Sequence, residues 1–552
     1  MDTQSLRIPD SIHGHGNTGA TRSIEATSFY AVLILVFAAL IRLAFFSRGL
    51  GTDEIVYMTQ AQRLLAGDLG HAGYIGAIRY GINGFQALSF ALFGPGIVGA
   101  SGLFFACSLA NVMLVYWFAD RLWGRWAAIW AGLALATLPI DVTLAGGLNP
   151  DPYLGLFITA SIITFYFAEN RDSAVLYFSA GLLAGWVFWI KEEVIVFGLV
   201  FVFLGASQPR WRNGWLWFLF GGFLSWASDL IFFWAAYGDP IYHYKVVHRT
   251  VDDQISGQVL GETSPWIYVK LLLVKIYHTG LLGWLALGGA VLALRPRAQP
   301  QTRFVLIWGA GLILIFSALP VSFWPLEFIR KQGNYMEIFV APLALLAGWF
   351  LSQQRRIVTI VLGGAMVASG ILLSGLEQQV IRVVTVNGPA AAAFAQAHAG
   401  TPVFGPLTVQ RQSMIERLLQ GSLDSTNDIR PIADLGRLSL ARGAANDIVA
   451  YLVYDPQMRN WQGSENERQG GADPSYDLPE QVRDCLLPLD QLEQRDLGLG
   501  HSVLAALRGA FSLFPKPLSV PALRATASLW EVEPATVFAV TRACAQQTRS
   551  ST

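Results

Sequence analysis

The chain has 552 residues, of which 53% are hydrophobic and only 14% are charged. A soluble globular protein carries about a quarter charged residues, so this composition excludes an ordinary water-soluble enzyme. The formal net charge is zero. This value says little about partners, because the charges are segregated between the loops that connect the apolar runs. Apolar runs recur up to about residue 375, each close to the roughly 20 residues that span a bilayer, and they predict a polytopic α-helical membrane protein.

Residues 1–27 form a polar stretch ahead of the first apolar run, which lacks a small-residue cleavage site. We therefore expect residues 28–46 to be a retained transmembrane helix and not a signal peptide. A window of roughly 19 residues gives about eleven transmembrane helices, which together make a membrane module over residues 28–375. The predicted spans are 28–46, 97–118, 126–145, 153–169, 174–190, 193–207, 214–237, 270–294, 304–321, 337–352 and 357–375.

Basic residues collect in alternate short connections between these spans. Arg121 and Arg125 follow the second span, Arg171 follows the fourth, and Arg210 and Arg212 follow the sixth. The positive-inside rule makes these connections cytoplasmic. An odd number of spans then places the N-terminal tail in the cytoplasm and the C-terminal region outside it, as expected for a multi-pass protein of a bacterial inner membrane.

The first outer connection, residues 47–96, is predicted to be structured. Apolar residues at helical spacing predict a helix in residues 53–68, with Thr52 in the N-cap position. The segment 82–94 is apolar but too short to span a membrane, and it predicts a second helix along the interface. We expect this loop to form part of the roof of an active site.

Acidic residues occur at the outer ends of two spans. Asp53 and Glu54 follow the first span, and Asp151 lies between Pro150 and Pro152 ahead of the fourth. Unpaired carboxylates are costly in hydrocarbon, so such acids are held either in water or for chemistry. If these acids were only solvated, their role would be to stabilise the first turns of their helices through the helix dipole. A catalytic role needs an acid at the membrane face, near a second polar cluster and beneath a structured roof, and all three features are predicted.

Basic residues also occur on the predicted outer side. Lys191 ends the fifth span, where it can extend to the interface or contact a phosphate at headgroup depth. Lys245, Arg249, Arg330 and Lys331 belong to outer loops. Because the positive-inside bias makes basic clusters less expected there, an anionic ligand is favoured.

Motifs for several other functions are missing. The sequence contains no Walker A, GxGxxG, GxSxG or HExxH motif, so nucleotide-driven pumping and hydrolase chemistry lack their residues. His71, His243 and His248 do not share metal-ligand spacing, and no metal site is identified. Whether a divalent metal assists is left open.

The C-terminal region, residues 376–552, has a different composition. "TPVFGPL" and "NDIVAYLVYD" predict buried strands, "SMIERLLQ" predicts a helix, and "SLWEVEPATVFAVTRA" predicts a terminal hairpin around Glu533 and Pro534. We expect a small α/β domain on the extracytoplasmic side, with residues 460–480 as a polar loop.

Several segments in a fixed order resemble a known family. The acidic pair after the first span, "LFGPGIVGASGLFF", the acid before the fourth span and "EFIRKQGNYMEIFVAPLALLAGW" together resemble the GT-C glycosyltransferases. More narrowly, they are similar to the group of protein O-mannosyltransferases and aminoarabinose transferases. The resemblance covers roughly residues 28–355.

The resemblance implies that a sugar moves from a polyprenyl-phosphate donor to an extracytoplasmic acceptor, a glycan, lipid or protein hydroxyl or phosphate, with inversion; no nucleic acid is expected to bind. By position, Asp53 would be the general base, Glu54 its neighbour and Asp151 a second active-site acid, while Lys191 and Arg249 would hold the donor phosphate. The further phosphate-binding and cavity candidates are Lys245, Arg330, Lys331, Tyr57, His71, Arg79 and Tyr335.

Two other functions compete with this one. A transporter or flippase of an anionic lipid-linked substrate would use the same basic groups without chemistry, but such proteins usually contain internal repeats, and none is apparent here. A non-catalytic scaffold would leave the clustered acids and bases unexplained. A sugar transferase explains them, because a carboxylate can take the acceptor's proton while positive charge assists departure of a lipid phosphate.

Overall fold

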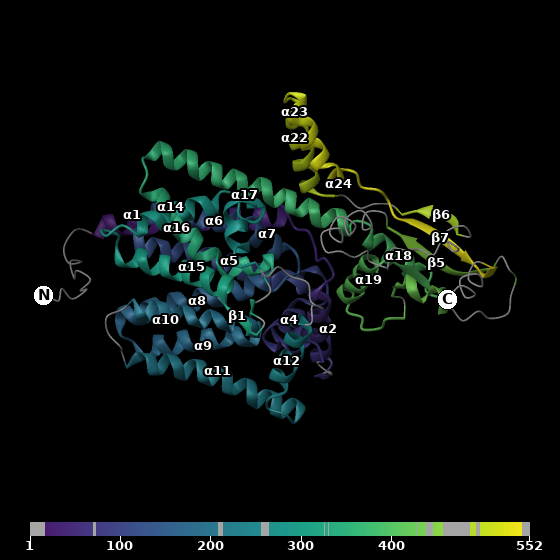
Figure 1. Ribbon diagram of the computed structural model, residues 1–552, viewed down its shortest axis with the longest axis horizontal. Coiled ribbons are helices and arrows are strands. Elements are labelled where there is room, and N and C mark those ends of the chain that lie inside the picture. Colours follow the sequence, from purple (N-terminus) through teal and green to yellow (C-terminus); the bar gives the residue numbers. More distant parts are fainter. Residues whose placement is uncertain are drawn as a thin grey trace.

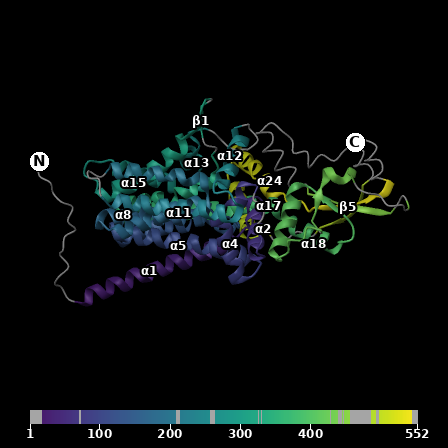
Figure 2. The ribbon, with the colours of Figure 1, turned by 90° about the horizontal axis from the view of Figure 1, so that it is seen from below.

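The computed structural model places a helical bundle beside a smaller α/β domain along the long axis of the molecule (Figures 1 and 2). The structure describes residues 17–69, 73–207, 213–255, 264–324, 326–328, 331–426, 428–437, 444, 447–455, 486–492 and 497–543.

The bundle consists of helices that are mostly apolar. Their order is α1 (Asn17–Ala44), α2 (Asp53–Leu65), α3 (Ile75–Ile78), α4 (Tyr80–Phe93), α5 (Ile97–Trp123), α6 (Arg125–Ala136), α7 (Pro139–Gly146), α8 (Asp151–Arg171), α9 (Ala174–Ile190), η1 (Glu192–Gly198), α10 (Leu199–Ala206), α11 (Gly214–Tyr237), α12 (Tyr242–Ile255), α13 (Ile267–Leu273), η2 (Ile276–His278), α14 (Leu282–Ala293), α15 (Pro300–Ala318), η3 (Gly333–Ile338), α16 (Val340–Ser352) and α17 (Arg356–Thr385). The strands β1 (Pro320–Phe323) and β2 (Leu326–Phe328) form an antiparallel hairpin between α15 and η3.

The membrane module that the sequence predicts is present as a set of apolar helices. Among the described residues, five helices are long and apolar enough to cross a membrane, and α6 with α7, bent by 52°, can form a sixth span. The shorter apolar helices of 10–17 residues are Ser28–Ala44, Ala174–Ile190, Val194–Ala206, Leu282–Ala293 and Val340–Ser352. Each predicted span therefore contains an apolar helix, whereas the number that cross the membrane stays a prediction.

The predicted span 270–294 is wrong in its first half. Helix α13 ends at Leu273, a short 3-10 turn follows, and α14 begins only at Leu282. His278 Nδ1 lies 2.5 Å from Glu377 Oε1 of α17, and Gly280 adopts a positive φ of 56°. Because ionisable side chains are costly within hydrocarbon, the chain turns at this polar segment instead of continuing as one helix.

The first outer loop folds into α2 and α4, as its apolar spacing predicts, and into the short helix α3, which the sequence did not predict. Thr52 stands at the N-cap of α2, but its side chain makes no capping hydrogen bond. It donates instead to Glu54. Helix α4 packs against both α2 and α5 and runs from Tyr80 to Phe93. The loop is thus a compact layer at one end of the bundle.

The C-terminal domain is a small mixed α/β unit, as predicted. Its sheet has the order β4-β3-β5-β7-β6, in which β3 is parallel to β4 and β5, and β7 is antiparallel to β5 and β6. Its elements are α18 (Gly388–Ala397), β3 (Val403–Gly405), α19 (Leu407–Leu419), β4 (Arg430–Pro431), η4 (Ile432–Arg437), β5 (Ile448–Tyr454), β6 (Leu487–Gln491), α22 (Leu499–Ser512), α23 (Lys516–Ala525), α24 (Ala527–Trp530) and β7 (Thr536–Thr541).

Two further expectations for this domain have different outcomes. The terminal hairpin around Glu533 is wrong, because the residues before it form α24 and β7 pairs with β5 and β6 instead. The polar loop expected at residues 460–480 lies outside the described residues.

The C-terminal domain rests on the first outer loop. Ile415 and Leu418 of α19 pack with Met58 of α2 in one apolar cluster. Gln62 Nε2 donates to the carbonyl of Leu418 at 2.6 Å. These contacts bring α19 against α2, the helix that begins with the acidic pair. The domain therefore supports the first outer loop at the end of the bundle (Figure 2).

Close backbone contact joins α9 to α11 in the bundle. A Cβ added at Gly181 would lie 1.9 Å from the carbonyl oxygen of Phe218, and one at Gly221 would lie 2.3 Å from that of Phe178. Small residues permit this approach in membrane helices, where packing supplies much of the association energy.

We predict that Gly181→Val forces α9 and α11 apart and destabilises the fold by about 1–3 kcal/mol, because overpacking of a tight contact strains its surroundings. Thermal unfolding in detergent will measure the change as a lower Tm. The control is Gly364→Val in α17, where an added Cβ meets no atom within 4 Å. Equal Tm values for the two variants would contradict the importance of this contact.

Candidate active site

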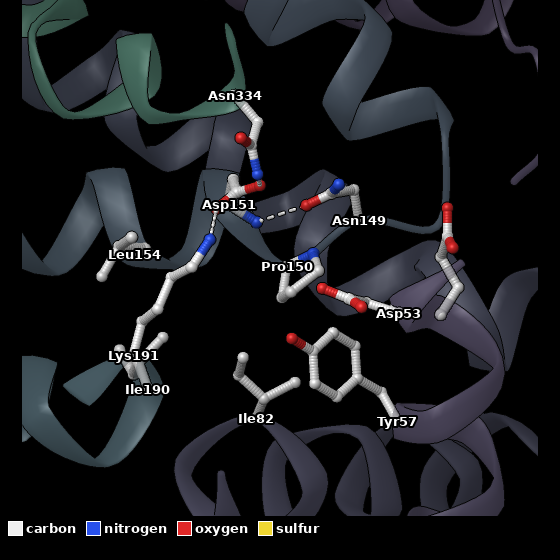
Figure 3. A pocket seen from close by; sticks show the side chains of 11 residues that line it. Asp53, Tyr57, Ile82, Asn149, Pro150, Asp151, Leu154, Ile190, Lys191 and Asn334 are labelled. Atoms are coloured by element: carbon white, nitrogen blue, oxygen red, sulfur yellow. Dashed lines mark hydrogen bonds and ion pairs between the residues drawn. The ribbon is translucent and has the colours of Figure 1, made fainter. Parts of the chain in front are cut away.

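A pocket lies where the first outer loop meets the ends of α8 and α9 (Figure 3). The first two outer connections, distant in sequence, both contribute carboxylates to it. The lining residues are Asp53, Glu54, Tyr57, Ile82, Asn149, Pro150, Asp151, Leu154, Ile190, Lys191 and Asn334.

Asp151 is held in the pocket wall by its own turn and by two distant residues. It opens α8, and its backbone N–H donates to Asn149 Oδ1 at 3.0 Å. Lys191 Nζ donates to Asp151 Oδ1 at 3.3 Å, and Asn334 Nδ2 donates to Oδ2 at 2.9 Å. The residue is 3% exposed. Both carboxylate oxygens are therefore engaged, and the acid is fixed in place.

Lys191 follows the last residue of α9 and turns its ammonium into the pocket. Its Nζ lies 4.4 Å from the centre of the Tyr335 ring, a distance that permits a cation–π contact. The side chain is buried, so Lys191 does not extend to solvent as a surface lysine would. Its neighbour Glu192 does not neutralise it, because that carboxylate pairs with Arg79. The positive charge of Lys191 is balanced by Asp151 alone among the described ion pairs.

Asp53 is the exposed carboxylate of the pocket. In the described part of the chain, its carboxylate accepts a hydrogen bond from Tyr74 Oη at 3.5 Å and forms no ion pair with a basic side chain. Figure 3 shows Asp53 and Tyr57 on the same side of the pocket, with Pro150 between Asp53 and Asp151. This carboxylate can therefore meet an incoming ligand without first breaking a salt bridge.

Glu54 adopts a different role from its neighbour. It is 5% exposed, and its Oε2 accepts hydrogen bonds from Thr52 N at 2.7 Å and Thr52 Oγ1 at 2.8 Å. Burial raises the pKa of Glu54 above its ordinary value, although the hydrogen bonds act against that change. Its other oxygen lies near Gly49, where an added Cβ would approach to 3.2 Å. Glu54 thus braces the turn that leads into α2.

Tyr57 connects the pocket to a buried ion pair. Its hydroxyl accepts a hydrogen bond from Arg79 Nη1 at 3.1 Å, and Arg79 binds Glu192 through Nε at 3.0 Å and Nη2 at 2.8 Å. Desolvation raises the pKa of Tyr57, so its hydroxyl stays protonated. Arg79 was predicted to line the cavity, and it lies behind Tyr57 with its charge already paired.

The remaining predicted residues do not line the pocket as the structure describes it. Lys245 and Arg249 are exposed on α12, and Lys245 Nζ pairs with Asp239 Oδ2 at 2.6 Å. Lys331 is buried beside Phe328, and burial lowers the pKa of its ammonium. Their roles in binding phosphate stay predictions.

His71 and Arg330 lie outside the described residues. Tyr335 contacts the Lys191 ammonium with its ring. In the described ranges, no group of three or more His, Cys, Asp and Glu side chains could hold a metal ion.

Sequence reasoning missed Asn149 and Asn334, which both contact Asp151. Asn334 is directly beside the predicted Tyr335, and Asn149 is two residues before the predicted Asp151. Amides carry no charge, and a search for ionisable groups does not find them. Asp229 in α11 is a buried acid outside the pocket, and its carboxylate lies 2.9 Å from His243 Nδ1 of α12.

Two crystal structures of ArnT from Cupriavidus metallidurans, one in the apo state and one bound to undecaprenyl phosphate, match 81% of this chain and 95% of theirs. Their TM-scores are 0.53 and 0.52, at 16% and 14% sequence identity. The chain has the GT-C glycosyltransferase fold. The resemblance predicted from the sequence is thereby confirmed.

Sequence comparisons agree with the GT-C fold. The family model "Dolichyl-phosphate-mannose-protein mannosyltransferase" matches residues 81–232. An undecaprenyl phosphate-alpha-4-amino-4-deoxy-L-arabinose arabinosyl transferase from Pseudomonas paraeruginosa is 25% identical over 352 residues, which cover 59% of this chain and 60% of that protein. The chain therefore spans less than two thirds of the length of this curated relative.

The burial of Glu54 makes the stability of the fold depend on pH. Because its pKa in the folded chain lies above the ordinary 4.5, the folded state retains this proton when the unfolded state has lost it. Stability therefore falls as the pH rises above 4.5 and Glu54 ionises. Glu54→Gln keeps the acceptor oxygen without the charge, so we expect its Tm relative to the parent protein to increase between pH 4.5 and neutral pH.

Thermal unfolding in detergent across this range measures the difference. Asp68→Asn, at an exposed position of the same loop, is the control, and its Tm difference from the parent should vary less with pH. A Tm difference for Glu54→Gln that stays constant with pH would contradict the assignment.

Proposed function

We propose that this chain is a membrane glycosyltransferase that moves a sugar from a polyprenyl-phosphate donor to an extracytoplasmic acceptor with inversion. One observation carries the proposal. The exposed carboxylate of Asp53 and the buried Lys191–Asp151 ion pair line the same pocket. The names of the relatives, which refer to undecaprenyl phosphate and dolichyl-phosphate-mannose, support a lipid-phosphate donor.

Asp53 acts as the general base. Its carboxylate takes the proton of the acceptor hydroxyl while that oxygen forms a bond to the anomeric carbon of the sugar. The bond between the anomeric carbon and the phosphate oxygen breaks, and its electron pair leaves with the polyprenyl phosphate. A single displacement from the opposite face inverts the anomeric configuration.

Lys191 stabilises the leaving phosphate. Negative charge develops on the phosphate as the bond breaks, and an ammonium fixed in a desolvated wall stabilises that charge more strongly than one in water. Asp151 keeps Lys191 oriented and is itself oriented by Asn334, so Lys191 need not be reorganised during the reaction. Three acidic side chains, Asp53, Glu54 and Asp151, and one ammonium line the pocket, so a phosphate needs further positive charge. The predicted bases Arg249 and Lys331, which do not line the pocket in this structure, are candidates to supply it.

The positions of the basic residues support an orientation in the membrane. Helix α8 begins at Asp151 in the pocket and ends at Arg171, and its length of about 30 Å matches the hydrocarbon core of a bilayer. Arg121 and Arg125 flank the α5–α6 turn, at the end of α5 away from the outer loop. By the positive-inside rule that end is cytoplasmic, and the pocket and the C-terminal domain lie outside, in a bacterial inner membrane.

We predict that Asp53→Asn reduces sugar transfer by about 100-fold or more, because it removes the base while keeping the size of the side chain. The measurement is transfer of radiolabelled sugar from polyprenyl-phosphate donors in membranes containing each variant. Asp68→Asn, an exposed acid of the same loop outside the pocket, is the matched control and should retain activity. Full transfer by a folded Asp53→Asn variant would remove the proposed base.

Lys191→Gln should lower kcat and raise KM for the donor, because it removes positive charge from the leaving phosphate and leaves Asp151 without its ionic partner. Initial rates at varied donor concentration separate the two constants. Lys270→Gln, at an exposed position of α13, is the control. A variant at Lys191 with the parent's kcat and KM would argue against a phosphate contact, and transport of intact donor without release of sugar would favour a flippase.

A further inference from the structure

Residues 497–530 differ from the rest of the C-terminal region in charge and hydropathy. The segment contains Arg508, Lys516 and Arg524 but no aspartate or glutamate. It folds into α22, α23 and α24, of which α22 and α23 project from the body of the molecule as a helical hairpin (Figure 1). A positively charged hairpin without acids is suited to contact with an anionic surface.

The hairpin carries its apolar side chains on the outside. Leu513 is 86% exposed, Phe514 55%, Leu518 66% and Val520 48%, whereas Ser519 is buried. In a helical hairpin that is surrounded by water, apolar residues face the partner helix and polar residues face solvent. The opposite arrangement at this tip indicates that its surroundings are not water alone.

The base of the hairpin is packed on the membrane helix α17. A Cβ added at Gly500 would lie 2.4 Å from the carbonyl oxygen of Gly375, and Gly500 N donates to Gln378 Oε1 at 2.7 Å. Between Arg356, where α17 begins, and Gly375 the helix rises about 28 Å, close to the thickness of the hydrocarbon core. The hairpin therefore leaves α17 at the level of the membrane surface on the side of the C-terminal domain.

The direction of the hairpin follows that surface. Figure 1 shows α22 and α23 running across the direction of α17 and away from the bundle, not along it. Arg508 of α22 joins the two helices by donating to the carbonyl of Leu523 and to Thr526 Oγ1, and it lies over the Trp530 ring. These contacts hold the hairpin as a fixed projection in the plane of the membrane.

We propose that α22 and α23 form an interfacial anchor that inserts its apolar tip into the adjacent leaflet and binds anionic phospholipid headgroups. Leu513, Phe514, Leu518 and Val520 enter the boundary between headgroups and acyl chains, and Lys516 and Arg524 contact lipid phosphates. A basic amphipathic segment at this depth gains both from burial of apolar area and from attraction to anionic lipid. Because only residues 531–535 separate α24 from β7, the anchor also limits the distance between the C-terminal sheet and the membrane.

The test uses the full-length protein in nanodiscs containing anionic phospholipid, with an environment-sensitive fluorophore on one introduced cysteine. Leu518→Cys reports on the tip of the hairpin. Ile448→Cys is the matched control, because Ile448 is also an exposed apolar residue, 46% exposed, but lies at the start of β5 in the sheet. Each label is quenched separately by aqueous iodide and by nitroxide-labelled lipid.

We expect the label at Leu518 to be quenched by the nitroxide lipid and to be several-fold less sensitive to iodide than the label at Ile448. Lys516→Glu combined with Arg524→Glu should weaken quenching by the lipid when anionic phospholipid is present. Quenching of Leu518 by iodide equal to that of Ile448 would overturn the proposal. Protection of Leu518 from both quenchers would also overturn it, because the hairpin would then be covered by protein and not by lipid.

Discussion

The ion pair between Lys191 and Asp151 is the interaction on which the candidate site depends. It joins the end of α9 to the start of α8, and Asn334 adds η3 to the same carboxylate. Charged groups at the edge of hydrocarbon are retained only when they are paired or hydrated, and breaking a buried pair leaves an uncompensated charge. The pair therefore fixes three segments of the bundle relative to one another and determines the shape of the pocket wall.

The adjacent acids Asp53 and Glu54 illustrate how one helix turn separates two roles. Successive residues of an α-helix lie about 100° apart around its axis, so neighbouring carboxylates face different surroundings. Asp53 faces the open pocket, whereas Glu54 faces the turn before α2 and accepts hydrogen bonds from Thr52. The same pair thus supplies one accessible acid and one structural acid, and the structural acid keeps the helix that carries the other in position.

The C-terminal domain contributes to the site without lining it. Its helix α19 packs on α2 through apolar residues, and Arg48 Nη1 of the first loop binds Glu416 Oε1 at 2.5 Å. The first outer loop is therefore held between the bundle on one side and the α/β domain on the other. A short surface helix that stood alone would be marginally stable, so this support maintains the geometry of Asp53.

The sequence by itself determined the apolar helices of the bundle, the two helices of the first outer loop and the placement of Asp53, Asp151 and Lys191 at the ends of spans. A helix that spans a bilayer must be a long apolar run, and such a run can be recognised from local hydropathy alone. The sequence did not predict the break near His278 or the helix α24, because both depend on distant partners. His278 contacts Glu377, and Gln379 of α17 donates to the carbonyl of Leu529 in α24.

Only the tertiary structure decided which polar groups meet. Arg79 pairs with Glu192 across 113 residues, and Asn334 reaches Asp151 across 183. Hydropathy indicates where a charge is tolerated, but the partner of that charge follows from how the helices pack, and packing is a property of the whole chain.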